Sequence, residues 1–247
     1  MIAIRYLYIF ILILLSANYL YSQNIDFKPS NFKSDKEGLK QALKYLKDGD
    51  LYLEKGNEAI FSRKDPLDNF EMAIFYYLKA NKFNPSNLEL NIKLGNAYLY
   101  TNSKYKSFVF LDRAMKIYVN EKDRPVNIYF YYAMALHLEG RYKEAISNFR
   151  IFKKLEKDKD FKPYADFYRK YIKECENAIE LSSQPNKVWV DNIRLNSIYD
   201  DWSPCLTADG EFLIFTSNRP NENMEDEIGR YDNDIYFSTL NDRKWNS

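Results

Sequence analysis

Apolar side chains recur every three or four positions from residue 36 to residue 183, and glycine and proline are rare in this stretch. This spacing is typical of helices with one buried face. After the turn-forming sequence Ser-Ser-Gln-Pro-Asn at residues 182–186, apolar and polar residues alternate, which is typical of strands. The pattern predicts a helical domain over residues 36–183 and an all-β domain over residues 188–247.

Within the helical stretch, small and bulky residues repeat at fixed spacing. A small residue is followed by a bulky one four positions later, and this pattern starts at Ala73, Ser107 and Ala145, which are 34 and 38 residues apart. A further small residue, Gly95 or Ala133, stands 12 positions before the second and third starting points. Small residues at such positions let two helices approach closely, so the spacing predicts repeated pairs of packed helices.

The period of 34 resembles that of the tetratricopeptide-repeat family. Two segments, Leu94-Gly95-x-x-Tyr98 and Gly140-x-Tyr142-x-x-Ala145-x-x-x-Phe149, stand as that family writes them. The resemblance implies an α-helical tetratricopeptide solenoid of three repeats, closed by a capping helix over residues 163–181.

Two features depart from the family pattern. Asn91 stands where the second repeat would carry a bulky aromatic residue, and about 12 additional residues lie between Gly56 and Phe70 in the first repeat. We expect these additional residues to form a loop around residues 63–66.

The resemblance also implies a protein-binding groove, because in this family the first helix of each pair lines the concave face. Matching offsets assign six residues to that groove: Asn96, Leu99, Tyr100, Phe130, Met134 and His137. Such an apolar and aromatic surface suits a partner helix or an extended segment. The same side chains could instead pack against neighbouring helices, and the sequence leaves both interpretations open.

The β domain shows clear strand and turn signals. Residues 212–217 are rich in strand-forming residues and follow Asp209-Gly210, a hairpin signal. Residues 234–238 form a second expected strand, and another begins at Lys244-Trp245. Together with the segment from Asn196 to Arg219, these residues resemble a TolB-type β-propeller repeat.

That resemblance implies that residues 188–247 form the first blade of an incomplete β-propeller. Proteins that combine an exported helical-repeat domain with such blades usually continue with further blades and an OmpA-like domain that binds peptidoglycan. They belong to the Gram-negative envelope, and some act in type IX secretion. The sequence therefore predicts the N-terminal part of a longer envelope protein.

Several polar residues and both cysteines allow more specific expectations. Asp200 and Asp201 either cap backbone donors or form paired carboxylates for acid–base chemistry, and capping is the favoured interpretation. Arg219 is placed to pair with Asp234 across the sheet. Acidic residues at 222–227, 232 and 234 suggest calcium only weakly, because a complete ligand set is absent. Cys175 and Cys205 flank the domain junction and either form a disulfide or remain two buried thiols.

The N-terminus has the order of a secretory signal peptide, which we assign to residues 1–22. One cation, Arg5, precedes an apolar run over residues 6–15 and a more polar stretch over residues 16–23. An uncleaved anchor is the alternative. We expect an exported protein in the periplasm or at the periplasmic face of the outer membrane.

The composition of the chain argues against several classes of function. The chain of 247 residues carries 36 Lys+Arg and 35 Asp+Glu, a net charge of +1, which argues against nucleic-acid binding. One His and two Cys leave little material for a metal site, so we expect no metal and no cofactor. The sequence contains no nucleophile elbow or triad pattern.

We therefore expect a non-enzymatic scaffold that binds protein partners of the cell envelope, with peptidoglycan as a further ligand of a C-terminal domain. A propeller-based peptidase or glycosidase, with its active site in further blades, is the alternative. A truncated product whose blade never folds is the third interpretation.

Overall fold

The computed structural model describes residues 23–62, 64–119, 125–184, 195–220, 231–241 and 244–246. The chain divides into two compact units, Met1–Gln184 and Pro185–Ser247. The predicted signal peptide and the acidic segment 222–227 lie outside the described residues. None of the described helices is long and apolar enough to cross a membrane.

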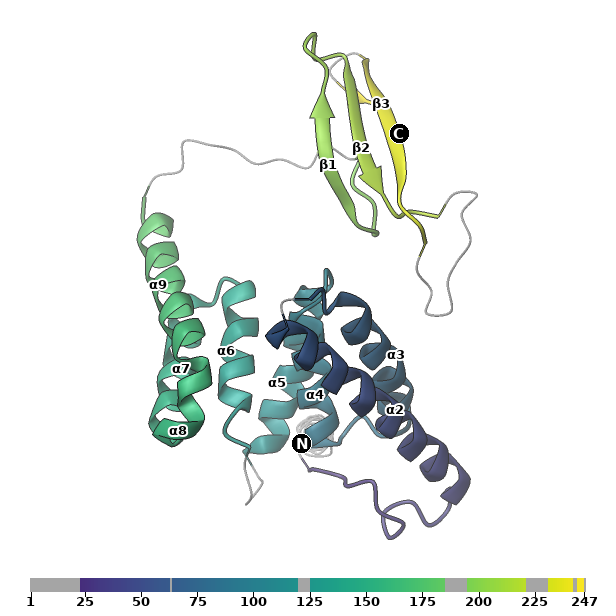
Figure 1. Cartoon of the computed structure of the whole chain (residues 1–247), viewed down its shortest axis with the longest axis vertical. Coiled ribbons are helices and arrows are strands. Elements are labelled where there is room, and N and C mark those ends of the chain that lie inside the picture. Colours follow the sequence, from purple (N-terminus) through teal and green to yellow (C-terminus); the bar gives the residue numbers. More distant parts are fainter. Residues whose placement is uncertain are drawn as a thin grey trace, which may run out of the picture. The chain divides into compact units, whose positions relative to one another are not determined.

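The first unit consists of consecutive helix pairs followed by a further helix (Figure 1). The pairs are α2 (Lys36–Phe61) with α3 (Leu67–Phe83), α4 (Leu88–Leu99) with α5 (Ser107–Tyr118), and α6 (Ile128–Leu138) with α7 (Tyr142–Leu155). The shorter elements η1 (Lys104–Lys106), α8 (Asp158–Phe161) and η2 (Lys162–Tyr164) precede α5 and α9 (Ala165–Ser182).

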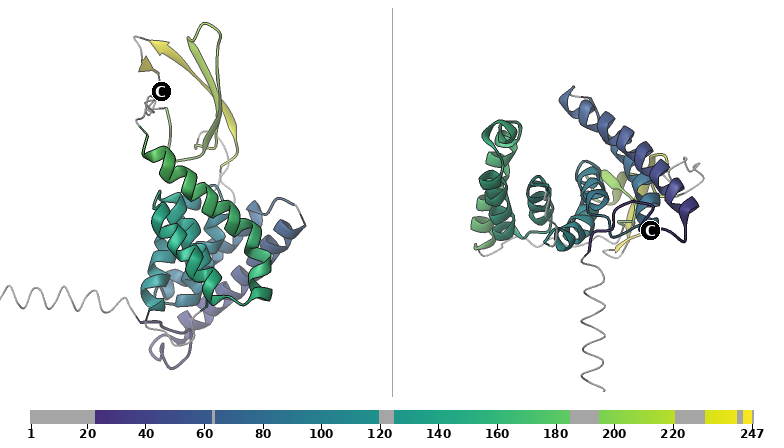
Figure 2. Two further views of the ribbon diagram at one scale, coloured as in Figure 1. Left: turned by 90° about the vertical axis from the view of Figure 1, so that its left-hand side faces the viewer. Right: turned by 90° about the horizontal axis from the view of Figure 1, so that it is seen from below.

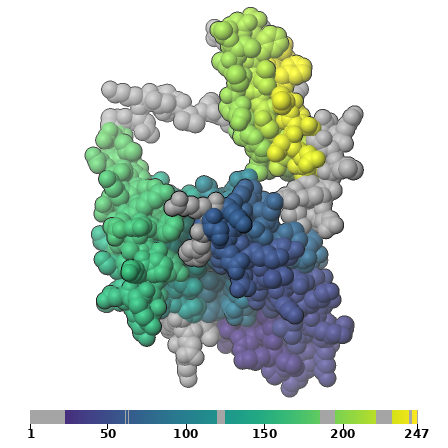
Figure 3. All heavy atoms as spheres, in the orientation of Figure 1, coloured from purple at the N-terminus to yellow at the C-terminus, as the bar shows by residue number. Residues whose placement is uncertain are grey.

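The helix pairs stack in sequence order. Besides the contacts within each pair, α3 contacts α4, α5 contacts α6, and the first helices α2, α4 and α6 contact one another in turn. Helix α9 packs against α7 and α6. Figure 2 shows the resulting arc of helices, and Figure 3 shows the same order on the surface from purple and blue α2 to green α9. The unit is a solenoid-like helical array.

The small residues of the repeat lie where the two helices of a pair meet. A Cβ atom added to Gly49 would lie 2.5 Å from the ring of Tyr77, and one added to Gly95 would lie 2.3 Å from Cγ of Leu111. Both partner side chains are fully buried. The predicted role of the small residues in close helix contact is confirmed.

The additional residues of the first repeat correct one expectation. Helix α2 continues to Phe61 and ends at Ser62, so the connection to α3 is only residues 62–66. Residues 57–61 contain neither glycine nor proline, and Ala59 is buried. Between Gly56 and Phe70, residues 57–61 thus extend α2, residues 67–69 belong to α3 and residues 62–66 connect them, so the loop lies where it was expected but is shorter.

The second unit is a four-stranded antiparallel sheet with strand order β1-β2-β3-β4. Its strands are β1 (Asp201–Leu206), β2 (Phe212–Ser217), β3 (Asp234–Asn241) and β4 (Lys244–Trp245). Leu195, Leu213 and Phe215 form a small core on one face. The strand predictions are confirmed, whereas the assignment to a propeller blade stays a prediction.

The hairpin between β1 and β2 forms as the sequence predicts. Gly210 has a φ of +75°, a conformation that favours glycine. The carboxylate of Asp209 accepts hydrogen bonds from the Thr207 hydroxyl at 2.5 Å and the Glu211 backbone N–H at 3.0 Å. These contacts lower the pKa of Asp209.

Candidate functional site

The groove residues predicted in the third repeat are covered by the C-terminal end of the helical array. Phe130 and Met134 are only 3% and 7% exposed. The Phe130 ring lies 5.0 Å from the ring of Tyr164 in η2 and 5.2 Å from that of Phe152 in α7. These side chains therefore pack between α6, α7 and the segment leading into α9.

His137 lies at the contact between α6 and α9. Its ring meets the rings of Tyr142 and Tyr171 edge-on at 5.7 and 5.5 Å, and its Nε2 lies 3.7 Å from the Glu174 carboxylate. Burial lowers the pKa of His137, although Glu174 acts in the opposite direction. A neutral imidazole held in this way contributes to helix packing.

The three groove residues predicted in the second repeat lie in similar surroundings. Asn96 and Leu99 are 7% and 8% exposed. Tyr100 stacks on Phe70 with 4.9 Å between ring centroids, and burial raises its pKa to about 12. Of the six predicted residues, only Tyr100 and His137 stay partly accessible, so the structure favours the packing interpretation for the other four. Partner binding by these six residues stays a prediction.

An open pocket of about 510 Å³ lies instead at the first repeat, between α2, α4 and the segment before α2. Leu46 stands three residues before Gly49, as Phe130 stands before Ala133. Asp50 follows Gly49 directly, in the position that Asn96 and Met134 hold after the small residues of their repeats. The pocket is lined by Asp26, Phe27, Lys28, Leu43, Leu46, Lys47, Asp50, Asn87, Glu89, Leu90 and Lys93.

One end of the pocket is a fixed charge network. Lys93 Nζ lies 2.8 Å from Asp50 Oδ1 and 2.7 Å from Glu89 Oε1. The Tyr77 hydroxyl donates to Asp50 Oδ1 at 2.7 Å, and burial together with this carboxylate raises the Tyr77 pKa. Burial would lower the pKa of Lys93, but its hydrogen bonds to Asp50 and Glu89 raise it overall. The network therefore joins α2, α3 and α4, and Lys93 within it stays charged at neutral pH.

The segment before α2 forms one wall of the pocket and is held in place by the α3–α4 turn. The Ile25 N–H donates to the Ser86 carbonyl at 3.1 Å. In return, the Ile25 carbonyl accepts from Asn84 Nδ2 at 2.7 Å and from Asn87 Nδ2 at 3.0 Å. The Phe27 ring stacks on that of Phe83. The wall is thus part of the fold.

The pocket offers apolar surface with charges of both signs around it. Leu43 is 43% exposed, and Leu46 and Phe27 are half-buried. Three lysines and three acidic residues share the lining. Such a surface suits an apolar side chain of a protein segment with polar neighbours. Sequence reasoning missed this site, although the offsets from Gly49 point to it.

The calcium interpretation that the sequence disfavoured falls partly on residues 222–227, which lie outside the described residues. Among the residues that the structure describes, no group of three or more His, Cys, Asp and Glu is placed to hold a metal ion.

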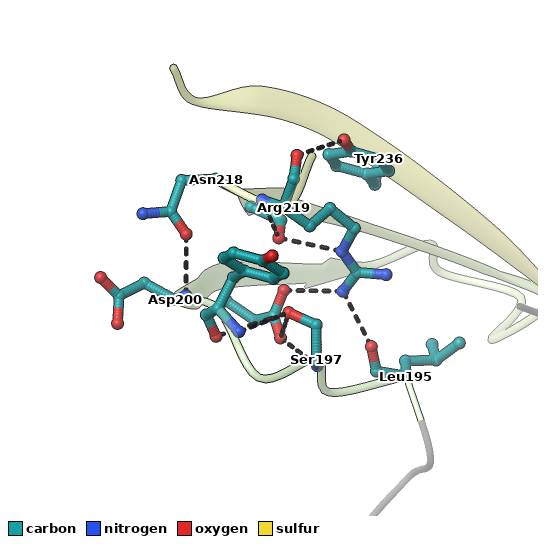
Figure 4. A network of polar contacts seen from close by, with 9 residues as sticks. Leu195, Ser197, Asp200, Asn218, Arg219 and Tyr236 are labelled. Atoms are coloured by element: carbon teal, nitrogen blue, oxygen red, sulfur yellow. Dashed lines mark hydrogen bonds and ion pairs between the residues drawn. The ribbon is translucent and has the colours of Figure 1, made fainter. Parts of the chain in front are cut away.

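In the sheet, a polar network surrounds Arg219 (Figure 4). Asp201 accepts from Arg219 Nη2 at 2.7 Å and from the Ser197 N–H at 2.6 Å. Burial would raise the pKa of Asp201, but hydrogen bonds from Ser217, Arg219 and Ser197 lower it to about 2. The Arg219 guanidinium also donates to the Leu195 carbonyl at 2.9 Å.

This network decides two expectations from the sequence. Asp201 caps a backbone donor, as expected. The Asp201 carboxylate binds Arg219, whereas the Asp200 carboxylate points away from Arg219 (Figure 4). Asp200 and Asp201 therefore do not form a carboxylate pair. The backbone N–H of Asp200 donates to Asn218 Oδ1 at 2.8 Å. The ion pair that the structure shows for Arg219 is with Asp201, which corrects the predicted pairing with Asp234.

The two cysteines are free thiols. Cys175 is fully buried in the cluster that α9 forms with α6 and α7, and burial raises its pKa to about 11. Cys205 is exposed on β1. The alternative of two buried thiols holds for Cys175 alone, and a disulfide between the two units stays a prediction.

No protein-family model and no curated protein matches the chain. Among solved structures, the tetratricopeptide-repeat domain of Arabidopsis OM64 is similar to it, with a TM-score of 0.37 and 23% sequence identity. The similarity covers 54% of this chain and 98% of that domain.

Proposed function

We propose that this chain is a non-enzymatic scaffold that binds a protein partner through the pocket between α2, α4 and residues 26–28. The observation that carries this proposal is the pocket itself, an apolar and charged surface at repeat positions whose counterparts in the third repeat are covered by η2 and α9. The surrounding hydrogen bonds fix its walls before a partner arrives, which reduces the entropic cost of binding.

The partner is a helix or an extended segment of another protein. Its central apolar side chain contacts Leu43 and Leu46, and polar neighbours face the mixed charges at the rim. The charge network around Lys93 is already satisfied, so it restricts which charges a partner can place nearby.

The setting that we propose is the cell envelope. Export is supported by the order of charged, apolar and polar residues over residues 1–22. The four-stranded antiparallel sheet has the strand order of a propeller blade and supports a TolB-type interpretation of the second unit. Roles in outer-membrane or type IX secretion assembly, and peptidoglycan binding through a further domain, belong to this proposal.

Site-specific photo-crosslinking tests the pocket. A photoreactive amino acid at Leu43, which lines the pocket, is expected to capture one defined protein from the envelope of the source cells. The matched position is Leu78 on α3, which is 39% exposed and lies outside the pocket lining. A product at Leu43 that is absent at Leu78 supports the proposal, whereas equal products at both positions, or none at Leu43, contradict it.

A further inference from the structure

The sheet has a second apolar face, opposite to its core. Paired residues of neighbouring strands share a face, and Cys205, Ile214 and Phe237 form one such row across β1, β2 and β3. The outer face, as we call it, has a centre of Cys205, Phe212, Ile214, Thr216, Ile235, Phe237 and Thr239, and the pair Asn241 and Lys244 lies at its β4 edge. The residues between them, such as Leu213 and Phe215, point into the core.

The outer face is unusually exposed for its composition. Ile235 and Phe237 are 78% and 74% exposed, and Phe212 and Ile214 are each 42% exposed. Their exposed surface is roughly 500 Å², near the upper end of the largest apolar patch on a typical monomer. A surface of this kind marks an interaction site.

The exposed edge of β1 is poorly suited to hydrogen bonding with another strand. A bulge lies between Trp202 and Cys205, Ser203 has a φ of +52°, and Pro204 lacks a backbone donor. Bulges and prolines at an edge strand prevent the continuous hydrogen bonding that an added strand requires. An additional β element is therefore expected to cover the face of the sheet and not to extend its β1 edge.

We propose that the outer face binds the outer face of a second copy of this chain. Its central residues carry no charge, and the β3–β4 register adds the charged Lys244 only at the β4 edge, so the apolar centres of two copies meet without like-charge repulsion. Two such faces bury about 1,000 Å², the lower size limit of a specific interface. The proposed complex is a symmetric dimer in which two sheets pack face to face. This dimer contact does not involve the pocket on the helical unit.

Cys205 provides a direct readout in the full chain. It lies within the outer face, whereas Cys175 is fully buried with a pKa raised to about 11 and does not compete for a thiol reagent. We expect the alkylation rate of Cys205 to fall about fivefold or more between about 1 µM and about 100 µM protein, because mass action forms the pair. A rate that is fast at every concentration overturns the proposal. A rate that is slow at every concentration also overturns it, since another part of the same chain then covers the face.

Two substitutions test the same contact by sedimentation. Ile235→Lys and Phe237→Lys place a charge in the outer face without touching the core, because both side chains are mostly exposed. Each is expected to weaken the dimer at least about 100-fold, since an unpaired buried charge is strongly unfavourable. Val109→Lys on α5, where Val109 is 55% exposed, is the matched control and is expected to remain dimeric.

Circular dichroism checks that each variant keeps the fold. A wild-type chain that stays monomeric at about 100 µM overturns the proposal. So does a dimer that both variants retain, because its contact then lies elsewhere.

Discussion

Two glycines set the distance between paired helices in the first two repeats. Gly49 faces Tyr77 across α2 and α3, and Gly95 faces Leu111 across α4 and α5. In both pairs the bulky side chain occupies the space that a Cβ atom would need. The repeated spacing in the sequence therefore results from a steric contact that recurs in each of these two helix pairs.

Replacing Gly95 with alanine tests that contact. Alanine ordinarily stabilises a helix interior by about 1 kcal/mol relative to glycine, but here its Cβ would lie 2.3 Å from Leu111 Cγ. We expect Gly95→Ala to lower the free energy of unfolding by about 1–3 kcal/mol, measured by urea denaturation. In a double-mutant cycle, Leu111→Ala should remove most of this added loss. A stabilised Gly95→Ala variant would show that the helices can separate freely.

The second prediction at the residue scale concerns pH. The folded pKa of Asp201 is about 2, below its ordinary value of 3.8, so Asp201 contributes stability above pH 4 that is lost as the pH falls toward 2. All three tryptophans lie in the second unit, so their fluorescence reports unfolding of the sheet. We expect the free energy of unfolding to fall between pH 4 and pH 2 in the wild type and to fall less in Asp201→Asn.

Asp200→Asn is the matched control for this measurement, because the Asp200 carboxylate points away from Arg219 (Figure 4). An equal pH dependence in Asp201→Asn and the wild type would mean that the Arg219 network does not stabilise the sheet.

At the scale of the elements, local patterns in the sequence predict what local interactions determine. The strand at residues 212–217 matches β2, and the Asp209-Gly210 hairpin forms, because alternation and turn chemistry act over a few residues. The loop expected around residues 63–66 lies in the right place but is shorter than expected, because nothing in residues 57–61 ends α2 before Ser62.

Which residues of the inner face stay accessible could not be predicted from a local sequence pattern. The offsets from small residues identified the inner face of the array, but they could not show that η2 and α9 would cover Phe130, Met134 and His137. Coverage depends on how a later helix packs. The pocket beside Leu43 and Leu46 stays open, and the same offsets applied to Gly49 would have located it.

Replacing Phe130 tests whether this residue serves helix packing or partner binding. It is 3% exposed and contacts three aromatic rings from later elements, so Phe130→Ala should lower the stability of the helical unit by about 3–5 kcal/mol. Thermal unfolding followed by far-ultraviolet circular dichroism measures this loss. Leu43→Ala, at an exposed position, should change stability by no more than about 0.5 kcal/mol. If Phe130→Ala kept full stability but lost partner binding, the groove assignment from the sequence would be restored.

At the scale of the whole molecule, each unit carries its own proposed interaction surface. The helical unit has a pocket whose walls are fixed by hydrogen bonds from Asn84 and Asn87 and by the ion pairs of Lys93. The sheet unit has an outer face with an apolar centre and one lysine, Lys244, at its β4 edge. One surface suits a single segment of another protein and the other suits a second sheet, so the two predict separate binding events.

The most direct test of the scaffold function is the affinity of the crosslinked partner for two variants of the full chain. Leu43→Glu puts a charge into the pocket, and Leu78→Glu makes the same change on α3, at a similarly exposed position outside the pocket. By isothermal titration calorimetry, we predict a dissociation constant at least about tenfold higher for Leu43→Glu and unchanged for Leu78→Glu. Equal affinity in both variants would contradict the assignment of the pocket as the partner-binding site.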